Sequence, residues 1–127
     1  MSYPDLADLD KAQAAVDVYP YDASQPAWQD IRIKGAGTCS DYVLGKIAML
    51  CDLSWPIEKL QIGIVLVEPE NRNPGETHAI LYVDDDHVLD QRQMGVVSLT
   101  ELQRIGYEPV EIQKIGGSRQ FVEWIWG

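Results

Sequence analysis

Cys39, His78 and Asp90 occur in that order along the chain, each in a local setting that suits thiol catalysis. Cys39 follows a glycine-punctuated segment and begins an apolar helical stretch. His78 opens the strand-like run 78–83, and Asp90 closes the next such run, 88–90. A thiol at a helix start, with a histidine and a carboxylate on neighbouring strands, is the arrangement of cysteine hydrolases and acyltransferases. The sequence therefore favours an enzyme in which these three residues are catalytic.

Cys39 needs a special environment, because a free thiol with a pKa of about 8.5 is mostly protonated at neutral pH. Unpaired N–H groups and the positive dipole end at a helix start favour the thiolate, and a protonated histidine favours it more. We expect Gly35 and Gly37 to let the backbone approach the sulfur and to leave N–H groups free for a developing oxyanion. The alternative, a small buried residue at a helix start, is a role that cysteine also fills well.

Cys51 offers a comparison within the same helical stretch. It has neither a glycine nor a cap before it, so we expect a packing role and an inert thiol. On one continuous helix Cys39 and Cys51 would lie about 18 Å apart, which is beyond disulfide reach. Two unbridged thiols suit a reducing compartment.

His78 can be a satisfied core residue or a base at the lip of a cleft, and pairing geometry decides whether Asp90 can reach it. If the turn 84–86 has three residues, Ile80 faces Asp90 across the hairpin. Asp90 is then a diagonal neighbour of His78 on the same face, at a Cβ separation of about 7 Å. A two-residue turn would put Asp90 on the wrong face. In the three-residue register, Asp90 would fix the tautomer of His78 and stabilise its imidazolium.

The other histidine, His87, lies beside Asp84, Asp85 and Asp86, where a solvated charge cluster is the default interpretation. The three-residue register pairs it with Val83, on the face opposite His78. The aspartate run lacks the alternating carboxylates and the glycine of a calcium loop. We therefore expect neither a metal nor a cofactor.

The elements that must position these residues follow from hydrophobic periodicity and turn residues. Ser98 and Glu101 form a capping-box pattern, and 60–67 is a nearly continuous β-branched run that predicts a buried strand. In chain order the pattern predicts a helix over 4–18, a loop over 19–38, a central helix over 39–53, a strand over 60–67, a loop over 68–76, a hairpin of 78–83 and 88–90 with a continuation at 96–97, a helix from 98 to about 106, a strand over 107–115 and a packed aromatic tail over 121–126.

Length and charge bound the class of protein. A chain of 127 residues is predicted to form one domain, 1–127, that buries a core without a metal or disulfide. The formal net charge of −10 repels phosphate backbones and anionic lipid, which disfavours nucleic acid and membrane surfaces as partners. The acidic, helix-like start lacks the features of a secretory signal, so we expect a cytoplasmic protein.

Four sequence blocks together resemble the bacterial transglutaminase-like cysteine peptidases: Gly-x-Cys-x-Asp-Tyr at 37–42, His-x-x-Leu-Tyr-Val at 78–83, Val-Leu-Asp at 88–90 and Gly-Tyr-x-Pro at 106–109. The resemblance implies an α+β, papain-like or transglutaminase-like core, in which a central helix carrying Cys39 packs on an antiparallel sheet. It also implies that Cys39 attacks an amide bond of a protein or peptide substrate and forms an acyl-thioenzyme. His78 would act as base and acid, with Asp90 orienting it.

The chain departs from the family pattern beside the nucleophile. Members often carry acidic residues on both sides of the cysteine that can help to bind calcium, whereas this chain has Thr38 and Ser40, so calcium dependence is not carried over. The residue after the aspartate, commonly Asn, is Gln91. The short chain without an export signal fits a compact cytoplasmic or phage-encoded relative.

The resemblance also suggests where a second oxyanion donor would come from. Relatives of this fold supply it from a side chain upstream of the cysteine, and Gln25, Trp28 and Gln29 lie in that segment. Trp28 could equally be a hydrophobic plug, the commoner role of a tryptophan in a long loop. We expect Asp41 to complement the first helical turn rather than take part in the chemistry.

Three alternatives remain open at this point. Release of the acyl group to water would make a peptidase or amidase, and release to an amine a transglutaminase. An NlpC-type cell-wall amidase also orders cysteine before histidine, but it usually has Asp-Cys-Ser-Gly at the nucleophile and a glycine-rich strand after the histidine, and this chain has neither. A catalytically degenerate module that binds a partner protein is compatible with the acidic surface and the Trp-rich tail.

Overall fold

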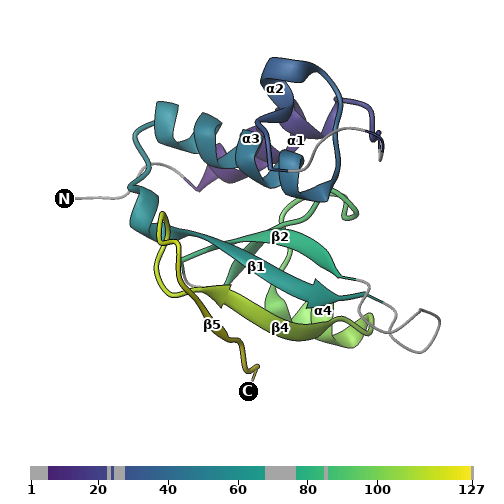
Figure 1. The fold of residues 1–127 in the computed structure, drawn as a ribbon, viewed down its shortest axis with the longest axis vertical. Coiled ribbons are helices and arrows are strands. Elements are labelled where there is room, and N and C mark those ends of the chain that lie inside the picture. Colours follow the sequence, from purple (N-terminus) through teal and green to yellow (C-terminus); the bar gives the residue numbers. More distant parts are fainter. Residues whose placement is uncertain (1–5, 23, 25–27, 68–76, 85, 127) are drawn as a thin grey trace.

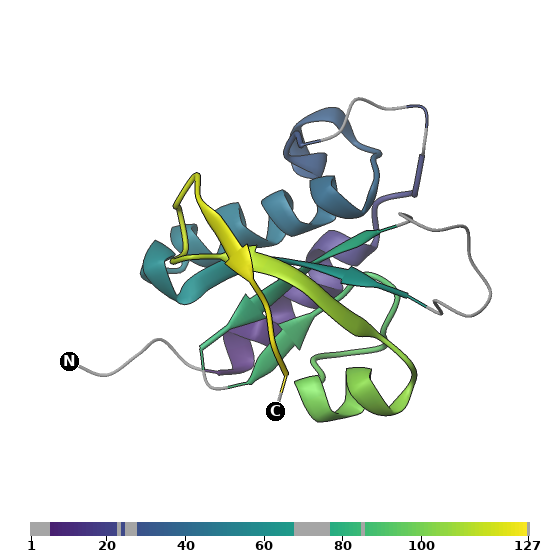
Figure 2. The ribbon, with the colours of Figure 1, turned by 60° about the horizontal axis from the view of Figure 1, so that its bottom comes forward.

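A layer of helices covers one face of a five-stranded sheet, and one short helix lies on the other side (Figures 1 and 2). The computed structural model describes residues 6–22, 24, 28–67, 77–84 and 86–126. The helices are α1 (Ala7–Asp17), α2 (Ile31–Lys34), α3 (Cys39–Asp52) and α4 (Leu99–Arg104), with a short 3₁₀ helix, η1, at Ile57–Lys59. The strands are β1 (Leu60–Leu66), β2 (His78–Val83), β3 (His87–Leu89), β4 (Glu108–Gln113) and β5 (Phe121–Glu123).

The strand order is β3-β2-β1-β4-β5, and every neighbouring pair is antiparallel. The β-branched run that predicted a buried strand is β1, which lies in the middle of the sheet with a partner on each side. The predicted class is confirmed: a central helix that begins at Cys39 packs on an antiparallel sheet in an α+β fold.

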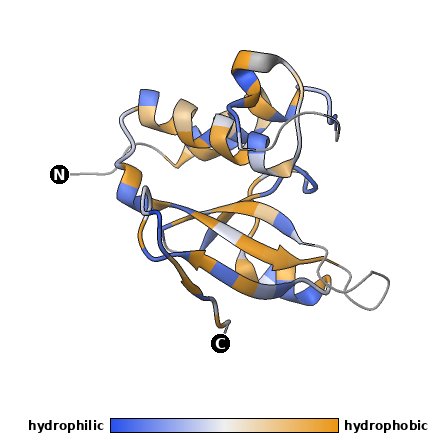
Figure 3. Ribbon diagram, in the orientation of Figure 1, coloured by the Kyte–Doolittle hydropathy of each residue, from blue (hydrophilic) through white to orange (hydrophobic). Residues whose placement is uncertain are grey.

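Alternate side chains of the strands build two hydrophobic clusters, one on each face of the sheet. Leu9 of α1 and Val43 of α3 pack with Leu81 beneath the helical layer, while Leu102 of α4 packs with Ile80 on the other face. Figure 3 shows the central strands and the facing side of α3 as mostly hydrophobic. The sheet is therefore packed on both faces, which fixes the positions of the residues at its edges.

The aromatic tail packs against the body, as predicted, and it also adds the unpredicted edge strand β5. Trp124 lies in the second cluster with 9% of its surface exposed, edge-on to the ring of Tyr82. A Cβ on Gly63 of β1 would come within 2.4 Å of the Trp124 ring. The indole therefore packs directly on the backbone of the central strand.

The segment 19–38, predicted to be a loop, contains the short helix α2. Asp30 caps it by accepting the N–H of Arg32 at 2.9 Å, and Gly35 ends it in the left-handed conformation with a φ of 82°. Ile31 is fully buried in a third cluster with Val16 and Tyr42, which explains why this single turn is held in place. A four-residue helix is too short to show a periodic hydrophobic pattern.

The β2–β3 hairpin has the three-residue register, which is the one of the two alternatives that places Asp90 on the same face as His78. Val83 pairs with His87 and Leu81 with Leu89, and continuing this register places Ile80 opposite Asp90. His87 faces away from the site and its Nδ1 lies 2.9 Å from the carbonyl oxygen of Asp84.

The elements that flank the hairpin also follow the prediction, except that the continuation predicted at 96–97 is a single bridge between Val88 and Val97. The predicted helix from 98 is α4, which Ser98 caps by accepting the N–H of Glu101 at 3.2 Å. The predicted loop 68–76 lies outside the described residues. Among the residues that the structure describes, no helix is long and apolar enough to span a bilayer.

Candidate active site

Cys39 is the first residue of α3, and the turn that holds it there is built around the buried carboxylate of Asp41. Asp41 accepts the N–H of Thr38 at 2.8 Å, as one half of a capping box, and the N–H of Gln29 at 2.7 Å. A Cβ on Gly37 would lie 2.5 Å from Asp41 Oδ2, so only glycine fits beside this cap. The helix-start role predicted for Asp41 agrees with these contacts.

One part of the role predicted for the two glycines is wrong, namely that their own N–H groups would be free for an oxyanion. The N–H of Gly35 donates to the carbonyl of Ile31 at 2.7 Å, because Gly35 ends α2. The N–H of Gly37 donates to the carbonyl of Pro20 at 3.2 Å, where residues 20–22 run beside 37. Both groups are used inside the chain, so neither is free to bind an oxyanion.

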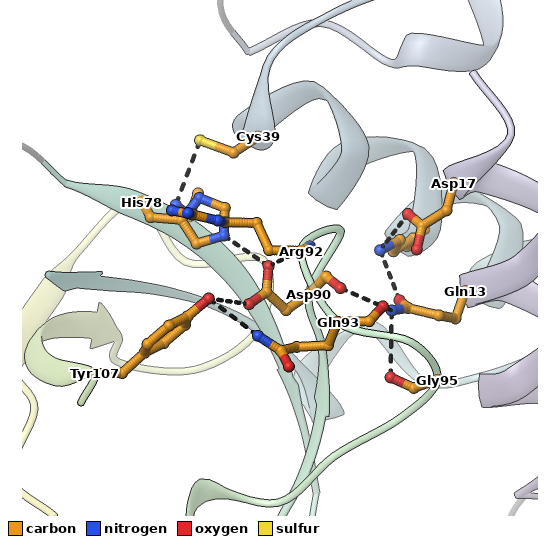
Figure 4. A network of polar contacts seen from close by, with 11 residues as sticks. Gln13, Asp17, Cys39, His78, Asp90, Arg92, Gln93, Gly95 and Tyr107 are labelled. Carbon is orange, nitrogen blue, oxygen red and sulfur yellow. Dashed lines mark hydrogen bonds and ion pairs between the residues drawn. The ribbon is translucent and has the colours of Figure 1, made fainter. Parts of the chain in front are cut away.

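The Cys39 thiol lies where α3 meets the start of β2. The N–H of Ala79 points at its sulfur at 3.5 Å, and His78 forms a side-chain hydrogen bond with it (Figure 4). Burial works to raise the pKa of the thiol, but the bonds from His78 and Ala79 and the charge of His78 together hold that pKa below its ordinary value. The surroundings therefore favour the thiolate.

His78 bridges the thiol and Asp90. Its Nε2 lies 2.6 Å from Asp90 Oδ1, which leaves Nδ1 as the ring nitrogen for the sulfur. His78 is 5% exposed and Asp90 is fully buried. Burial alone would lower the pKa of His78, but Asp90 and Cys39 raise it to about 9. Burial likewise opposes ionisation of Asp90, but the bond and charge of His78 together with the bonds from Arg92 and Tyr107 keep the pKa of Asp90 below its ordinary value.

Every oxygen of the Asp90 carboxylate has a donor, and one donor is Tyr107, which the sequence did not single out as a site residue. Arg92 donates its N–H to Oδ1 at 3.0 Å, and the Tyr107 hydroxyl donates to Oδ2 at 2.8 Å. Gln93 in turn donates to the Tyr107 oxygen at 3.2 Å. Burial and the neighbouring Asp90 charge raise the pKa of Tyr107 far above its ordinary value, so the hydroxyl stays a donor. Its ring stands edge-on to His78 at 6.3 Å.

The sequence analysis also missed a second group of polar residues, which contacts the backbone carbonyl of Asp90. The group consists of Gln13 and Asp17 of α1, labelled in Figure 4, and Lys46 of α3. Lys46 is 1% exposed and Gln13 is 3% exposed. Lys46 occurs between Val43 and Leu50 at the spacing of the buried stripe of α3, and a charged residue on an apolar helix face was the available signal.

A pocket of about 230 Å³ opens over the thiol and is lined by Tyr21, Cys39, Val67, Thr77, His78, Gln91 and Arg92. The upstream segment predicted to supply an oxyanion donor is tied to the same helix start. The N–H of Trp28 donates to Ser40 Oγ at 3.2 Å, and the Trp28 side chain is 48% exposed, which does not fit a hydrophobic plug. Gln29 is exposed beside it, and Gln25 lies outside the described residues.

Cys51 differs from the prediction in one respect. It lies in α3, as expected, but its side chain is exposed and therefore has no packing role. Burial of part of the side chain and the nearby charge of Asp52 raise the pKa of this thiol. Both cysteines are free. The two thiols of one helix thus have pKa values shifted in opposite directions.

The antiparallel sheet under a central helix is a transglutaminase-like fold. The chain matches the bacterial transglutaminase-like cysteine proteinases over residues 10–124 and belongs to that family. It is accordingly a cysteine peptidase-like hydrolase.

Solved structures of Legionella pneumophila LapG share the fold. One superposes with a TM-score of 0.73 and 17% identity, over 92% of this chain and 67% of that chain. A calcium-bound form gives a TM-score of 0.70 and 18% identity, over 92% of this chain and 71% of that one. Among curated protein sequences, none matches the chain significantly.

Calcium in that relative raises the question of a metal site here. Within the described ranges, no three or more His, Cys, Asp or Glu side chains gather closely enough to hold a metal ion. Thr38 and Ser40, which flank the thiol, bond to each other through their hydroxyls at 3.2 Å. The residues present beside Cys39 do not fit a calcium site.

Proposed function

We propose that the chain is a thiol-dependent peptidase or amidase in which Cys39 is the nucleophile, His78 the base and acid, and Asp90 the orienting residue. One observation carries the proposal: an unbroken line of hydrogen bonds runs from the sulfur through His78 to Asp90 at the wall of a pocket. The lowered thiol pKa and the raised histidine pKa favour a thiolate–imidazolium pair near neutral pH.

In the proposed reaction the Cys39 thiolate attacks the carbonyl carbon of an amide bond and forms a tetrahedral oxyanion. His78 Nδ1 gives its proton to the nitrogen of the leaving group as the carbon–nitrogen bond breaks, which leaves an acyl-thioenzyme. Neutral His78 then takes a proton from the incoming water, and hydrolysis of the thioester restores the thiolate. Asp90 holds the ring and offsets its charge throughout.

The oxyanion needs donors next to the sulfur. We propose the backbone N–H of Cys39 as one, because the first N–H groups of a helix have no partner within it. For the second we propose a side chain from the upstream segment that holds Gln25, Trp28 and Gln29. The backbone bonds of Trp28 and Gln29 to Ser40 and Asp41 support this, because they fix that segment against the first turn of α3.

The proposed substrate is a protein or peptide, with water as the acyl acceptor, and the proposed location is the cytoplasm. Membership of a proteinase family supports the substrate class. Two free cysteines support a reducing compartment. A pocket beside the thiol offers room for a segment of such a substrate.

Alkylation of the two thiols tests the proposal without knowledge of the substrate. The rate of iodoacetamide labelling would be measured from pH 5 to 10, site by site by mass spectrometry, with the exposed Cys51 as internal control. We expect Cys39 to label rapidly well below the ordinary thiol pKa, and His78→Ala to abolish this. Slow labelling of Cys39 at neutral pH that ignores His78→Ala would contradict the proposed mechanism and favour a binding module.

A further inference from the structure

Asp90 lies just after β3, at the start of an irregular segment, 90–95, and something other than strand pairing must hold it against His78. Gln13, a buried residue of α1, holds this segment through its side-chain amide. Its Nε2 donates to the carbonyl of Asp90 at 2.8 Å and lies 3.3 Å and 3.4 Å from the carbonyls of Gln93 and Gly95. The side-chain amide of Gln13 thus donates to three backbone carbonyls of a segment that is neither helix nor strand.

The direction of that amide is set by an ion pair between the buried ammonium of Lys46 and the partly buried carboxylate of Asp17. Lys46 of α3 donates to Gln13 Oε1 at 2.6 Å, and its ammonium lies 2.9 Å from Asp17 Oδ1. An ammonium can only donate, so it takes the amide oxygen and turns the NH₂ group toward the carbonyls. Figure 4 shows Gln13 between Asp17 and the segment that holds Asp90 and Gly95.

The ion pair is placed where stability alone gives little reason for it. Burial lowers the pKa of Lys46 and raises that of Asp17, and their mutual attraction opposes both shifts. Removing two charges from water can cost as much as their attraction returns, so such a pair is weak evidence for a contribution to stability. Here the arrangement that the pair selects includes the position of Asp90.

Helix α3 carries both Cys39 and Lys46. Lys46 lies seven residues after Cys39, two turns further along one face of α3. The thiol is thereby linked to Asp90 twice, once directly through His78 and once behind the site through Lys46 and Gln13.

We propose that Gln13, oriented by Lys46 and Asp17, is a positioning residue that holds the Asp90 carboxylate against His78. This inference rests on the catalytic roles proposed above. It predicts that loss of the Gln13 donors loosens the 90–95 segment, weakens the contact between Asp90 and His78, and so returns the Cys39 pKa toward that of a free thiol.

Gln13→Glu tests this most sharply. The variant keeps the size of the side chain and an oxygen for Lys46, but it places an acceptor against the three carbonyls in place of a donor. We expect labelling of Cys39 at pH 6.5 to slow by roughly tenfold, its pH midpoint to rise by about one unit, and amide hydrogen exchange in 90–95 to accelerate. Ala14→Glu adds the same charge at the next, exposed position of α1 and should change none of these.

The outcomes separate this proposal from the proposed function. An ordinary Cys39 midpoint in the wild-type protein would defeat the proposed function, whereas a lowered midpoint that Gln13→Glu leaves unchanged would overturn the role of Gln13 alone. If Gln13→Glu does not fold, Gln13→Met removes the donors without adding a charge and is measured in the same way. A wild-type midpoint in a folded Gln13→Met would then overturn the proposal.

Discussion

The Nε2 atom of His78 lies 2.6 Å from Oδ1 of Asp90, although the two residues are not paired in the sheet. They meet diagonally: Ile80, two residues after His78, is the residue that the register places opposite Asp90. Side chains two residues apart along a strand point to the same face, which brings the imidazole and the carboxylate together. The contact is therefore a property of the hairpin register as much as of the two side chains.

Asp90→Asn should remove most of the special reactivity of Cys39. The carboxylate accepts from His78, Arg92 and Tyr107, and an amide NH₂ in its place would face a donor. Without the negative charge the pKa of His78 falls and that of Cys39 rises. We expect labelling of Cys39 at pH 6.5 to slow by roughly tenfold or more.

The matched control for that substitution is Asp84→Asn. Asp84 is a carboxylate of the same hairpin, and it forms a part-exposed ion pair with Lys59 at 3.6 Å. Labelling should stay at the wild-type rate, since such surface pairs contribute about 0–1 kcal/mol. Equal rates for Asp90→Asn and the wild-type protein would show that the carboxylate does not influence the thiol.

Tyr107→Phe should cost stability first and reactivity second. The substitution leaves Asp90 Oδ2 without its donor in a fully buried site, which costs about 1–3 kcal/mol. The bond from His78 to Oδ1 remains, so Cys39 should keep more of its reactivity than in Asp90→Asn. Urea unfolding gives the stability, and Tyr21→Phe, at a tyrosine that is 58% exposed, should unfold as the wild type does.

Gly37→Ala should lower both stability and Cys39 labelling, whereas Gly35→Ala should lower stability alone. A Cβ on Gly37 would lie 2.5 Å from the Asp41 carboxylate, so the cap that positions Cys39 must shift, and both stability and Cys39 labelling should fall. A Cβ on Gly35 meets open space, but the φ of 82° is strained for alanine, so about 1 kcal/mol should be lost with labelling unchanged. Equal losses in both variants would contradict the packing of the Asp41 cap.

Cys39→Ser should change the pH dependence of stability. The folded pKa of His78 is raised, so its contribution is full below pH 6.5 and is lost as pH rises through about 9. The folded pKa of Cys39 is lowered, so its contribution is present above the ordinary thiol pKa and is lost as pH falls. In the wild-type protein these two contributions change with pH in opposite directions, so they offset each other.

In Cys39→Ser only the histidine titrates. Only Asp90 is then left to raise its pKa, and as pH rises above 6.5 the free energy of unfolding should fall relative to wild type, by at most about 1.4 kcal/mol per pH unit. Urea denaturation at pH 6.5, 7.5 and 8.5 measures the difference. Parallel pH curves for the two proteins would mean that Cys39 and His78 do not offset each other in this way.

Local sequence patterns were sufficient to predict most of the main elements. The apolar periodicity after Cys39 predicted α3, and the approach of Asp90 to His78 was predicted for a three-residue turn, which is the register observed. The fold class that the family resemblance implied is confirmed. That residues 1–127 form one domain stays a prediction.

The features that the sequence did not disclose depend on contacts between distant segments. Gln13 and the carbonyl of Asp90 are 77 residues apart, and no local pattern pairs them. The helix α2 is one turn held by the burial of Ile31, and β5 depends on pairing with β4. Cys51 was misplaced because an apolar stretch of helix does not by itself tell which of its residues faces solvent.

Whether the turn at 84–86 has an odd or an even number of residues decides whether Asp90 and His78 can meet. Because side chains alternate between faces, removal of one residue from this turn would carry Asp90 to the opposite side of the sheet while leaving Cys39, His78 and Asp90 unaltered in the sequence. Removal or addition of two residues would keep Asp90 on the same face as His78 and would change only the distance between the two side chains. Relatives with turns of differing length can therefore be sorted by counting: an odd number of turn residues preserves the meeting of histidine and aspartate, and an even number abolishes it.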